Sequence, residues 1–192
     1  EMAKFPAVFG ENRQPDGPYL LLPKVSSETR PYMPIGIFGP DTVASGSALI
    51  VPDGSLYHLG VLSSSMHMAW MRYTGGRMKS DYQYSSQIVY NNFPWPDSPS
   101  EKQVAAIMTS AQAVLATRSQ FPDASLADLY NPDTMPEALM KAHQQLDRAV
   151  DASYGKRNFA SDAERVAFLF ELYQKYTSLL PGDSKPKKSR RK

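Results

Sequence analysis

Short apolar runs separated by proline, glycine and aspartate make up the first half of the chain. Residues 19–26, 32–39 and 47–54 have the length and composition of β-strands. Residues 81–90, rich in tyrosine, isoleucine and valine, are predicted as a fourth strand. In residues 55–76, apolar side chains recur at three- and four-residue spacing, which predicts a helix that ends at two glycines. The first half is therefore predicted to be a small α+β unit.

From Ser98 onward the apolar positions follow helical periodicity. Three segments, Ser98–Glu101, Thr134–Glu137 and Ser161–Glu164, have capping-box spacing and predict three helix starts, with Gly155 ending the second helix. The predicted buried stripes are Val104, Ile107, Met108, Ala111, Val114 and Leu115; Leu139, Ala142, His143, Leu146, Ala149 and Val150; and Val166, Leu169, Phe170, Tyr173 and Tyr176. We expect the stripes to pack against each other or against the first half.

The predicted fold class is therefore α+β. A small mixed α/β domain at residues 1–97 is followed by an all-α helical domain at residues 98–180 and a basic flexible tail at residues 181–192. The tail holds six Lys/Arg and one Asp, a charge of +5. Because the whole chain carries +2, the first 180 residues carry −3. A basic tail on a near-neutral body indicates a polyanionic partner, although such tails also act as solubilising ends.

Composition excludes several classes of function. The chain has no cysteine, which rules out disulfides, thiolate metal sites and a cysteine nucleophile, and its three histidines argue against a His-rich metal site. No apolar run approaches the length of a membrane span, and the N-terminal residues show no secretory signal. We therefore expect no membrane association and a cytoplasmic location.

No catalytic motif is recognisable. Walker, G-x-G-x-x-G, H-E-x-x-H and G-x-S-x-G patterns are all missing. Ser65 and His67 would lie about 200° apart on a helix, so they are not predicted to form a nucleophile pair, and His67 is predicted to be a packed or capping residue. The segment "NNFPWP" (91–96) is predicted to form a rigid aromatic corner joining the two halves.

The stretch "GGRMKSDYQY" (75–84) alternates in chemistry. In a single strand, Arg77, Lys79, Asp81 and Gln83 would share one face, with Met78, Tyr82 and Tyr84 on the other. Lys or Arg, Asp and Gln are the side chains that read guanine, cytosine and adenine edges. From the pattern alone, a base-reading strand and a solvated edge strand with a weak Lys–Asp pair both stay open.

Three segments carry a family resemblance: "YLLLPKVSSETRPYMPIGIF", "HLGVLSSSMHMAWMRYTGGRMKSDYQYSSQIVYNNFPWP" and "ERVAFLFELYQKYTSLL" followed by basic residues. They resemble the C-terminal portion of MmeI-like DNA methyltransferases, which are single-chain type II restriction–modification enzymes. The resemblance covers roughly residues 17–185. It implies that residues 1–97 are a DNA target recognition domain and that residues 98–180 are a C-terminal helical domain. The nuclease and the methyltransferase that binds S-adenosylmethionine lie upstream in that family and are not among these 192 residues.

The resemblance also implies roles for individual residues. Lys79 and Asp81 occupy a variable charged pair that reads one base pair, and Gln83 falls among the specificity positions. Gly46 and Ser47 are placed in a second specificity region. Phosphate contacts are implied for a set of basic residues: Arg72, Arg77, Lys187, Lys188, Arg190 and Arg191.

The leading interpretation is a module that recognises a DNA sequence through base edges in the major groove. Its partners would be double-stranded DNA and the upstream methyltransferase domain of the same chain. The parent would be an adenine-specific methyltransferase that uses S-adenosylmethionine, and Mg²⁺ where it also cleaves, with no cofactor, metal or catalytic residue in this part. The alternative is a protein-interaction or structural domain with an aromatic surface formed by Tyr82, Tyr84, Tyr90, Phe93 and Trp95. A self-sufficient small enzyme has no nucleophile–base or metal constellation to support it.

Overall fold

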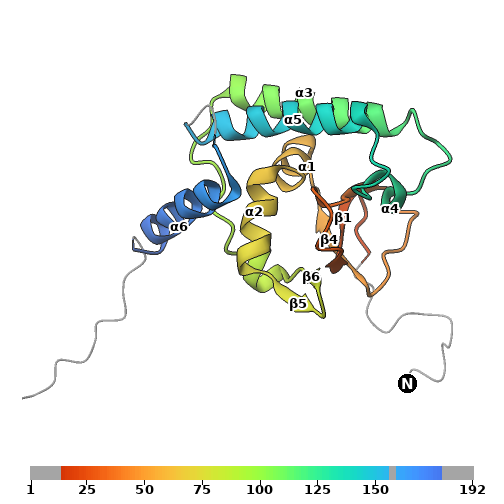
Figure 1. Ribbon diagram of the computed structural model, residues 1–192. Helices are drawn as coiled ribbons and strands as arrows, with labels where there is room; N and C mark the ends of the chain where they lie inside the picture. The colour runs from red at the N-terminus through yellow and green to blue at the C-terminus, as the bar shows by residue number, and fades with distance from the viewer. Residues whose placement is uncertain (1–13, 156–158, 179–192) are drawn as a thin grey trace, which may run out of the picture.

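The computed structural model describes residues 14–155 and 159–178 (Figure 1). The first half holds the strands β1 (Tyr19–Pro23), β2 (Val25–Ser26), β3 (Gly36–Phe38), β4 (Ala48–Pro52), β5 (Gly76–Met78) and β6 (Asp81–Gln83). It also holds the helices α1 (Leu56–Leu62) and α2 (Ser65–Thr74) and a π-helical turn, η2 (Ser86–Tyr90). The second half contains the helices α3 (Glu101–Arg118), α4 (Leu126–Leu129), α5 (Glu137–Ser153) and α6 (Asp162–Ser178). This order confirms the predicted α+β class.

The strands form two small antiparallel sheets. One has the order β3–β1–β4 and the other β2–β6–β5. The strands predicted in residues 19–26, 32–39 and 47–54 are confirmed, with the first divided between the two sheets. The strand predicted for residues 81–90 is correct only at its start, because Ser85 accepts a hydrogen bond from the backbone N–H of Ile88 and opens η2.

The helix predicted for residues 55–76 is two helices. Ser64 has extended backbone angles (φ −89°, ψ 163°) and accepts a hydrogen bond from the N–H of His67, so it ends the first segment and caps the second. The Ser64 hydroxyl also donates to the carbonyl of Val61 at 2.7 Å. Serine competes locally for backbone hydrogen bonds, which explains why the break falls here. Gly75 ends α2 as predicted.

The start of the first helix in the second half differs from its prediction. The cap of α3 is Ser100, which forms a capping box with Gln103, two residues beyond the predicted box at Ser98. Ser98 itself has φ 49° and lies outside the helix.

Of the predicted starts of the two later helices, one is wrong and one is confirmed. The box predicted at Thr134 is wrong, because Pro136 immediately precedes α5 and the Thr134 hydroxyl donates to the carbonyl of Asp128 instead. The cap predicted at Ser161 is confirmed, since its hydroxyl accepts from the N–H of Glu164 at 3.2 Å.

One hydrophobic core runs through both halves. The helices α3 and α5 lie side by side above α1, while α6 packs along α2 (Figure 1). The ring of Trp70 on α2 contacts Phe170 and Tyr173 of α6, with centroids 5.2 and 5.9 Å apart. The predicted packing of the helical stripes is confirmed in outline, with α3 and α5 against each other and α6 against the first half. Two stripe residues are corrected: Met108 and Phe170 lie at the edges of their stripes and are 36% and 39% exposed.

The aromatic corner predicted at residues 91–96 joins the halves as expected. The buried ring of Phe93 makes edge contacts with Trp95 and His67, with centroids 5.5 and 4.5 Å apart. From the second half, the Tyr154 hydroxyl donates to the carbonyl of Pro94 and the Tyr176 hydroxyl to that of Trp95. These contacts fix the connection that precedes α3.

Candidate nucleic-acid interface

Strands β5 and β6 form a hairpin, so the prediction of one continuous strand over residues 77–84 is wrong. A two-residue loop, Lys79–Ser80, reverses the chain and pairs Met78 with Asp81, Arg77 with Tyr82 and Gly76 with Gln83. Residues directly opposite one another share a face of the sheet. Asp81 and Gln83 therefore lie on the face of Met78, and Arg77 lies with Tyr82 on the other.

The face and loop of this hairpin still present polar side chains outward. Lys79 and Gln83 are exposed and Asp81 is half-buried, whereas Tyr82 is only 7% exposed. Lys79 occupies the left-handed region (φ 59°), which is uncommon for residues other than glycine and asparagine. The loop thus holds a lysine at its tip, next to the aspartate that begins β6.

Arg77 supports the hairpin from the opposite face. Its guanidinium lies over the ring of Tyr82, 4.0 Å from the centroid, and donates to the carbonyl of Ser80 at 2.7 Å. It also pairs with Glu28 at 3.3 Å. Part of its donor capacity is therefore used to hold the loop, and its side chain is 44% exposed.

The second predicted region, Gly46–Ser47, lies next to the same sheet through Lys24, a residue that sequence reasoning missed. The Lys24 ammonium donates to the carbonyl of Gly46 at 2.7 Å, and its backbone N–H donates to that of Ser47 at 3.0 Å. Its own carbonyl accepts from the N–H of Tyr84. The one available signal was a lone lysine inside the apolar run "LLLPKV".

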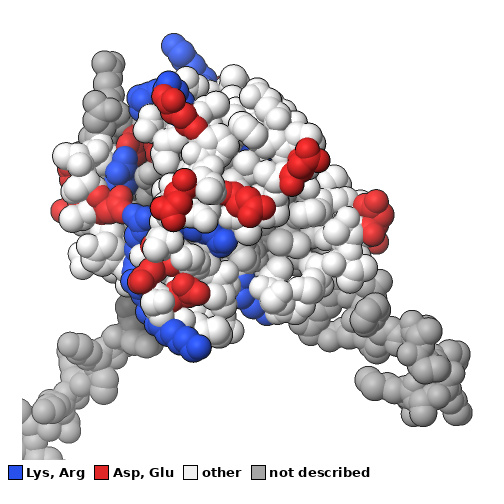
Figure 2. Space-filling model, turned by 45° about the vertical axis from the view of Figure 1, so that its right-hand side comes forward, with Lys and Arg blue, Asp and Glu red and all other residues white. Residues whose placement is uncertain are grey.

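A groove of about 420 Å³ lies beside the hairpin, with Lys24 in its wall. Its lining combines amide, hydroxyl, ammonium and apolar groups: Lys24, Leu49, Gly76, Gln83, Tyr84, Ser85, Ser86, Gln87 and Ile88. No carboxylate lines it. On the face shown in Figure 2, acidic and basic side chains are interspersed and neither sign forms a broad patch.

The remaining predicted phosphate contacts divide into two sets. Arg72 forms an ion pair with Asp162, and its second nitrogen donates to the carbonyl of Arg30 at 3.4 Å. Its guanidinium is thus engaged within the chain, and its phosphate contact stays a prediction. The tail residues Lys187, Lys188, Arg190 and Arg191 lie outside the described residues.

The histidine next to the interface is structural. His67 is fully buried, its Nε2 is 2.8 Å from the hydroxyl of Tyr84, and burial lowers its pKa to about 3. The Ser65 hydroxyl donates to Asp147 instead, which confirms that Ser65 and His67 are no nucleophile pair. Within residues 14–155 and 159–178 no cluster of His, Asp and Glu could hold a metal ion.

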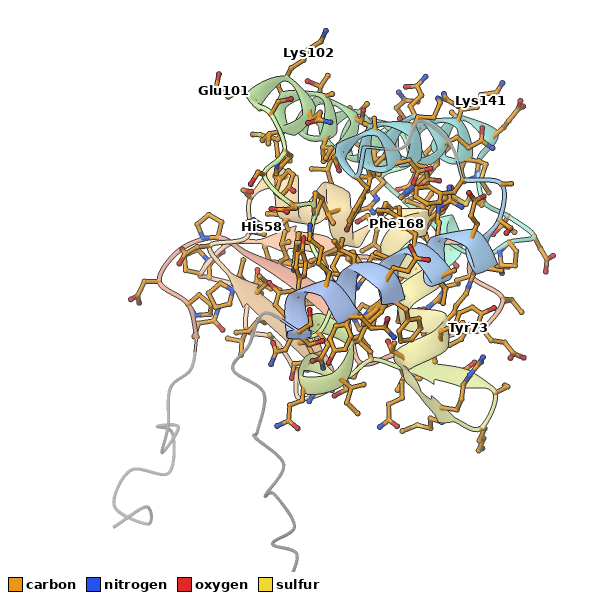
Figure 3. All side chains as sticks on the ribbon, turned by 90° about the vertical axis from the view of Figure 1, so that its left-hand side faces the viewer. His58, Tyr73, Glu101, Lys102, Lys141 and Phe168 are labelled. Atoms are coloured by element: carbon orange, nitrogen blue, oxygen red, sulfur yellow. The ribbon has the colours of Figure 1, made fainter. Side chains whose placement is uncertain are left out.

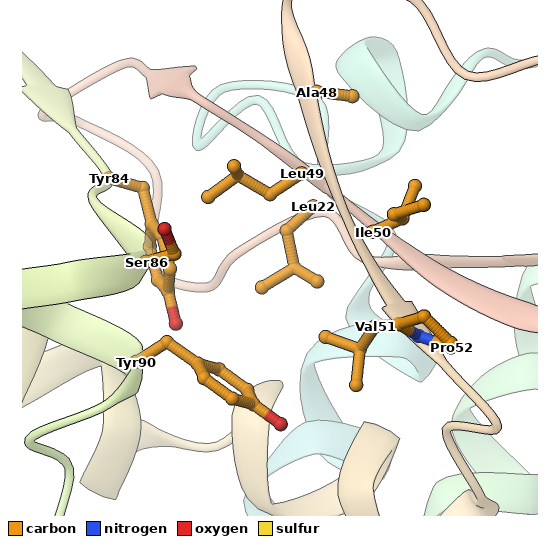
Figure 4. Close-up of a pocket in the computed structure, with 9 residues that line it drawn as sticks. All are labelled: Leu22, Ala48, Leu49, Ile50, Val51, Pro52, Tyr84, Ser86 and Tyr90. Atoms are coloured by element: carbon orange, nitrogen blue, oxygen red, sulfur yellow. The ribbon is translucent and has the colours of Figure 1, made fainter. Parts of the chain in front are cut away.

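An apolar hollow of about 480 Å³ lies behind the groove, between β4 and η2 (Figure 4). Leu22, Leu49 and Val51 face Tyr84 and Tyr90 across it. Of the five aromatics proposed as a partner surface, Tyr82, Tyr84 and Phe93 are buried in the core. The structure therefore counts against the protein-interaction alternative as it was framed.

Taken together, the fold and the site define an α+β domain that displays a polar hairpin and loop on a helical support. The chain belongs to the MmeI family: the model of the MmeI target recognition domain matches residues 1–97, and that of the MmeI C-terminal domain matches residues 99–181. This confirms the resemblance read from the sequence.

Two relatives extend this finding. DNA methyltransferase A of Bacillus subtilis (strain 168) is 38% identical over 177 residues, which are 92% of this chain and 20% of the relative. The solved structure of the Type IIL restriction–modification enzyme MmeI in complex with DNA is 48% identical, with a TM-score of 0.87 over 93% of this chain and 24% of that one. The chain thus spans about a fifth to a quarter of these relatives.

None of the helices in the described residues is long and apolar enough to cross a membrane.

Proposed function

We propose that this chain is the sequence-specific DNA recognition module of an adenine-specific methyltransferase of the restriction–modification type. The observation that carries the proposal is the likeness to MmeI in complex with DNA, at 48% identity and a TM-score of 0.87. The exposed polar hairpin supplies side chains of the kinds that read base edges in the major groove of double-stranded DNA.

Lys79 and Asp81 would read the two partners of one G·C pair. A lysine ammonium can donate to guanine O6 and N7, and an aspartate carboxylate can accept from the cytosine N4 amine. The hairpin places them two residues apart at its loop end, with the lysine at the tip and the aspartate at the first position of β6. Each charge would also limit the cost of burying the other against DNA.

The groove beside the hairpin would read neighbouring bases. Gln83 can contact adenine N6 and N7 in a bidentate manner. Gly46 has no atom within 4 Å of where a side chain would begin, so the loop leaves space for a base or for DNA backbone. Ser47 would supply a hydroxyl, and Lys24 an ammonium that lies against the Gly46 carbonyl.

Phosphate contacts would orient the module without reading sequence. Arg77 has the exposure for this role once its partner Glu28 releases it, and the basic tail residues match it in charge. Each neutralised phosphate steepens the salt dependence of binding.

S-adenosylmethionine would bind to the upstream part of the parent enzyme. The strand-to-helix turn between β4 and α1 holds a single glycine, Gly54, and a side chain there would lie 2.5 Å from Leu20. This glycine packs against the core and forms no open cradle for a ligand. Calorimetric titration of the 192-residue chain with S-adenosylmethionine is expected to show no stoichiometric binding.

The parent would also join this module to its methyltransferase domain and act in the cytoplasm. The lengths of the two relatives, four to five times that of this chain, support the presence of further domains in such proteins.

Selection from a pool of random duplexes tests the proposal. The chain is expected to enrich one short sequence and to bind it more weakly as salt rises. Binding that responds to salt but enriches no sequence would leave a non-specific DNA binder, and no binding at low salt would contradict the proposal for the isolated chain.

A further inference from the structure

A chain of four alternating charges ties α2, the helix that leads into the hairpin, to α6 and α5 of the helical half. Arg72 of α2 pairs with Asp162 of α6, and the other oxygen of Asp162 lies 3.7 Å from Arg165. Arg165 in turn binds both carboxylate oxygens of Asp151 on α5, at 2.8 and 3.4 Å. We call these four residues the clasp.

The clasp becomes more exposed from one end to the other. The Arg165 and Asp151 side chains are 12% and 5% exposed, whereas those of Arg72 and Asp162 are 29% and 34% exposed. A shielded ion pair with two parallel hydrogen bonds is strong, while a half-exposed pair contributes little to overall stability. The outer pair can therefore be altered while the inner pair and the packing of Trp70 on α6 keep the fold.

Arg72 stands at the point where α2 passes into the hairpin. It lies in the last turn of α2, and only Tyr73, Thr74 and Gly75 separate it from the start of β5. Its second nitrogen donates to the carbonyl of Arg30, in the turn that also supplies Glu28 to Arg77. Arg72 thus links α6 to the end of α2, which leads into the hairpin, and to the turn whose Glu28 pairs with Arg77.

We propose that the clasp positions the hairpin for base reading, with Arg72 acting as a positioning residue and Asp162 as its partner from the C-terminal domain. The helical half would then contribute to sequence discrimination without touching a base. The inference rests on the proposed function of the hairpin, and it gives Arg72 a role other than phosphate contact.

The substitution Asp162→Asn separates the two roles of Arg72 because they predict opposite signs. If Arg72 contacts phosphate, removal of the neighbouring acid frees a cation and strengthens binding to every duplex. If the clasp positions the hairpin, preference for the selected duplex over one altered at the base pair read by Lys79 and Asp81 falls roughly threefold or more, with binding to unrelated DNA unchanged.

The matched control is Glu137→Gln. Glu137 also pairs with a cation, Lys141, at 2.6 Å, so the control removes one acidic partner with the same change in net charge. Figure 3 shows Lys141 projecting outward at the opposite end of the molecule from the hairpin. Tyr73, near the end of α2, lies just above the hairpin in the same view. This control is expected to leave discrimination unchanged.

Hydrogen–deuterium exchange of the DNA-free chain tests the clasp without depending on the proposed function. Asp162→Asn and Arg72→Gln are both expected to speed exchange of the backbone amides in residues 76–83, while amides of α3 and α5 keep wild-type rates. Arg72→Lys, which keeps the charge, is expected to fall between them and wild type.

Hairpin amides that exchange at wild-type rates in Asp162→Asn would overturn the clasp, as would uniformly stronger DNA binding by that variant. If the wild type prefers no duplex, the proposed function fails, but the exchange arm still decides whether the clasp holds the hairpin.

Discussion

Two histidines inside the core make its stability depend on pH. Burial lowers the pKa of both His67 and His143 to about 3, with the Arg118 charge as a further cause for His143. The Tyr84 hydroxyl lies beside His67 and the Tyr130 hydroxyl beside His143, at 2.8 and 2.7 Å. Both rings are therefore held neutral in the folded state.

The free energy of unfolding is expected to fall as pH drops below about 6.5. The unfolded chain then binds protons that the buried, neutral histidines of the folded chain do not bind. Each histidine therefore lowers the free energy of unfolding by on the order of 1 kcal/mol per pH unit below that pH. Asp147 opposes this in part, because burial raises its pKa and favours its proton in the folded state. Urea unfolding at pH 7 and pH 5 measures the change.

His67→Gln is expected to reduce that slope by about half, since it removes one of the two groups. An identical pH dependence in this variant would show that His67 does not govern acid stability.

At the scale of elements, α1 lies close to the helices of the second half through Gly60. A side chain there would lie 2.6 Å from Ile107, and 3.3 Å from both Ala111 and Leu146. Gly60→Ala should therefore destabilise the chain by about 1–3 kcal/mol, although alanine favours a helix by about 1 kcal/mol. Thermal or urea unfolding tests this.

Gly46→Ala is the matched control, because open space surrounds that position. Its unfolding free energy should stay within about 0.5 kcal/mol of wild type. Equal effects of the two substitutions would contradict the close packing of α1.

Periodicity in the sequence was enough to predict most elements but not their reversals. The strands bounded by proline and glycine and the α3, α5 and α6 stripes follow from local pattern. The hairpin does not, because Lys79–Ser80 lacks the Asn-Gly or Asp-Gly signal of a two-residue loop. A reversal at that loop puts Arg77 opposite Tyr82, so the face predicted for Arg77 was wrong.

Some residues of the candidate site could not be predicted from the sequence, because their places depend on contacts between distant segments. Lys79, Asp81 and Gln83 are predicted from chemistry and resemblance, and the structure leaves Lys79 and Gln83 exposed and Asp81 half-buried. Lys24 needed the pairing of β2 with β6, and the Arg72–Asp162 pair joins residues 90 positions apart. No local pattern contains either relation.

For the whole molecule, the basic tail is expected to set affinity but not sequence choice. Its side chains are polar or small apart from proline, and most of its charge is positive. Removal of residues 183–192 should weaken binding to all duplexes about equally and flatten the salt dependence, because phosphate contacts carry no base information. Anisotropy titrations at several salt concentrations measure both effects, and a lost sequence preference would argue for base contacts by the tail.

We infer that a small α+β domain reads DNA through a hairpin held on a helical support. The loop end of that hairpin carries a lysine and an aspartate, which are opposite in charge and two residues apart. A single substitution there should lose about 1–3 kcal/mol of discrimination, since it leaves a like-charge pair or an unmatched group.

The most direct test is the exchange of both charges, Lys79→Glu with Asp81→Arg, in the parent enzyme, read out as the DNA sequence that becomes methylated or cleaved. We expect one position of the site to invert from G·C to C·G while the others keep their bases. The distal exchange Glu137→Lys with Lys141→Glu serves as the control and should leave the site unaltered. A doubly exchanged hairpin that recognises the wild-type base at every position would contradict the account and leave Lys79 and Asp81 as a solvated pair.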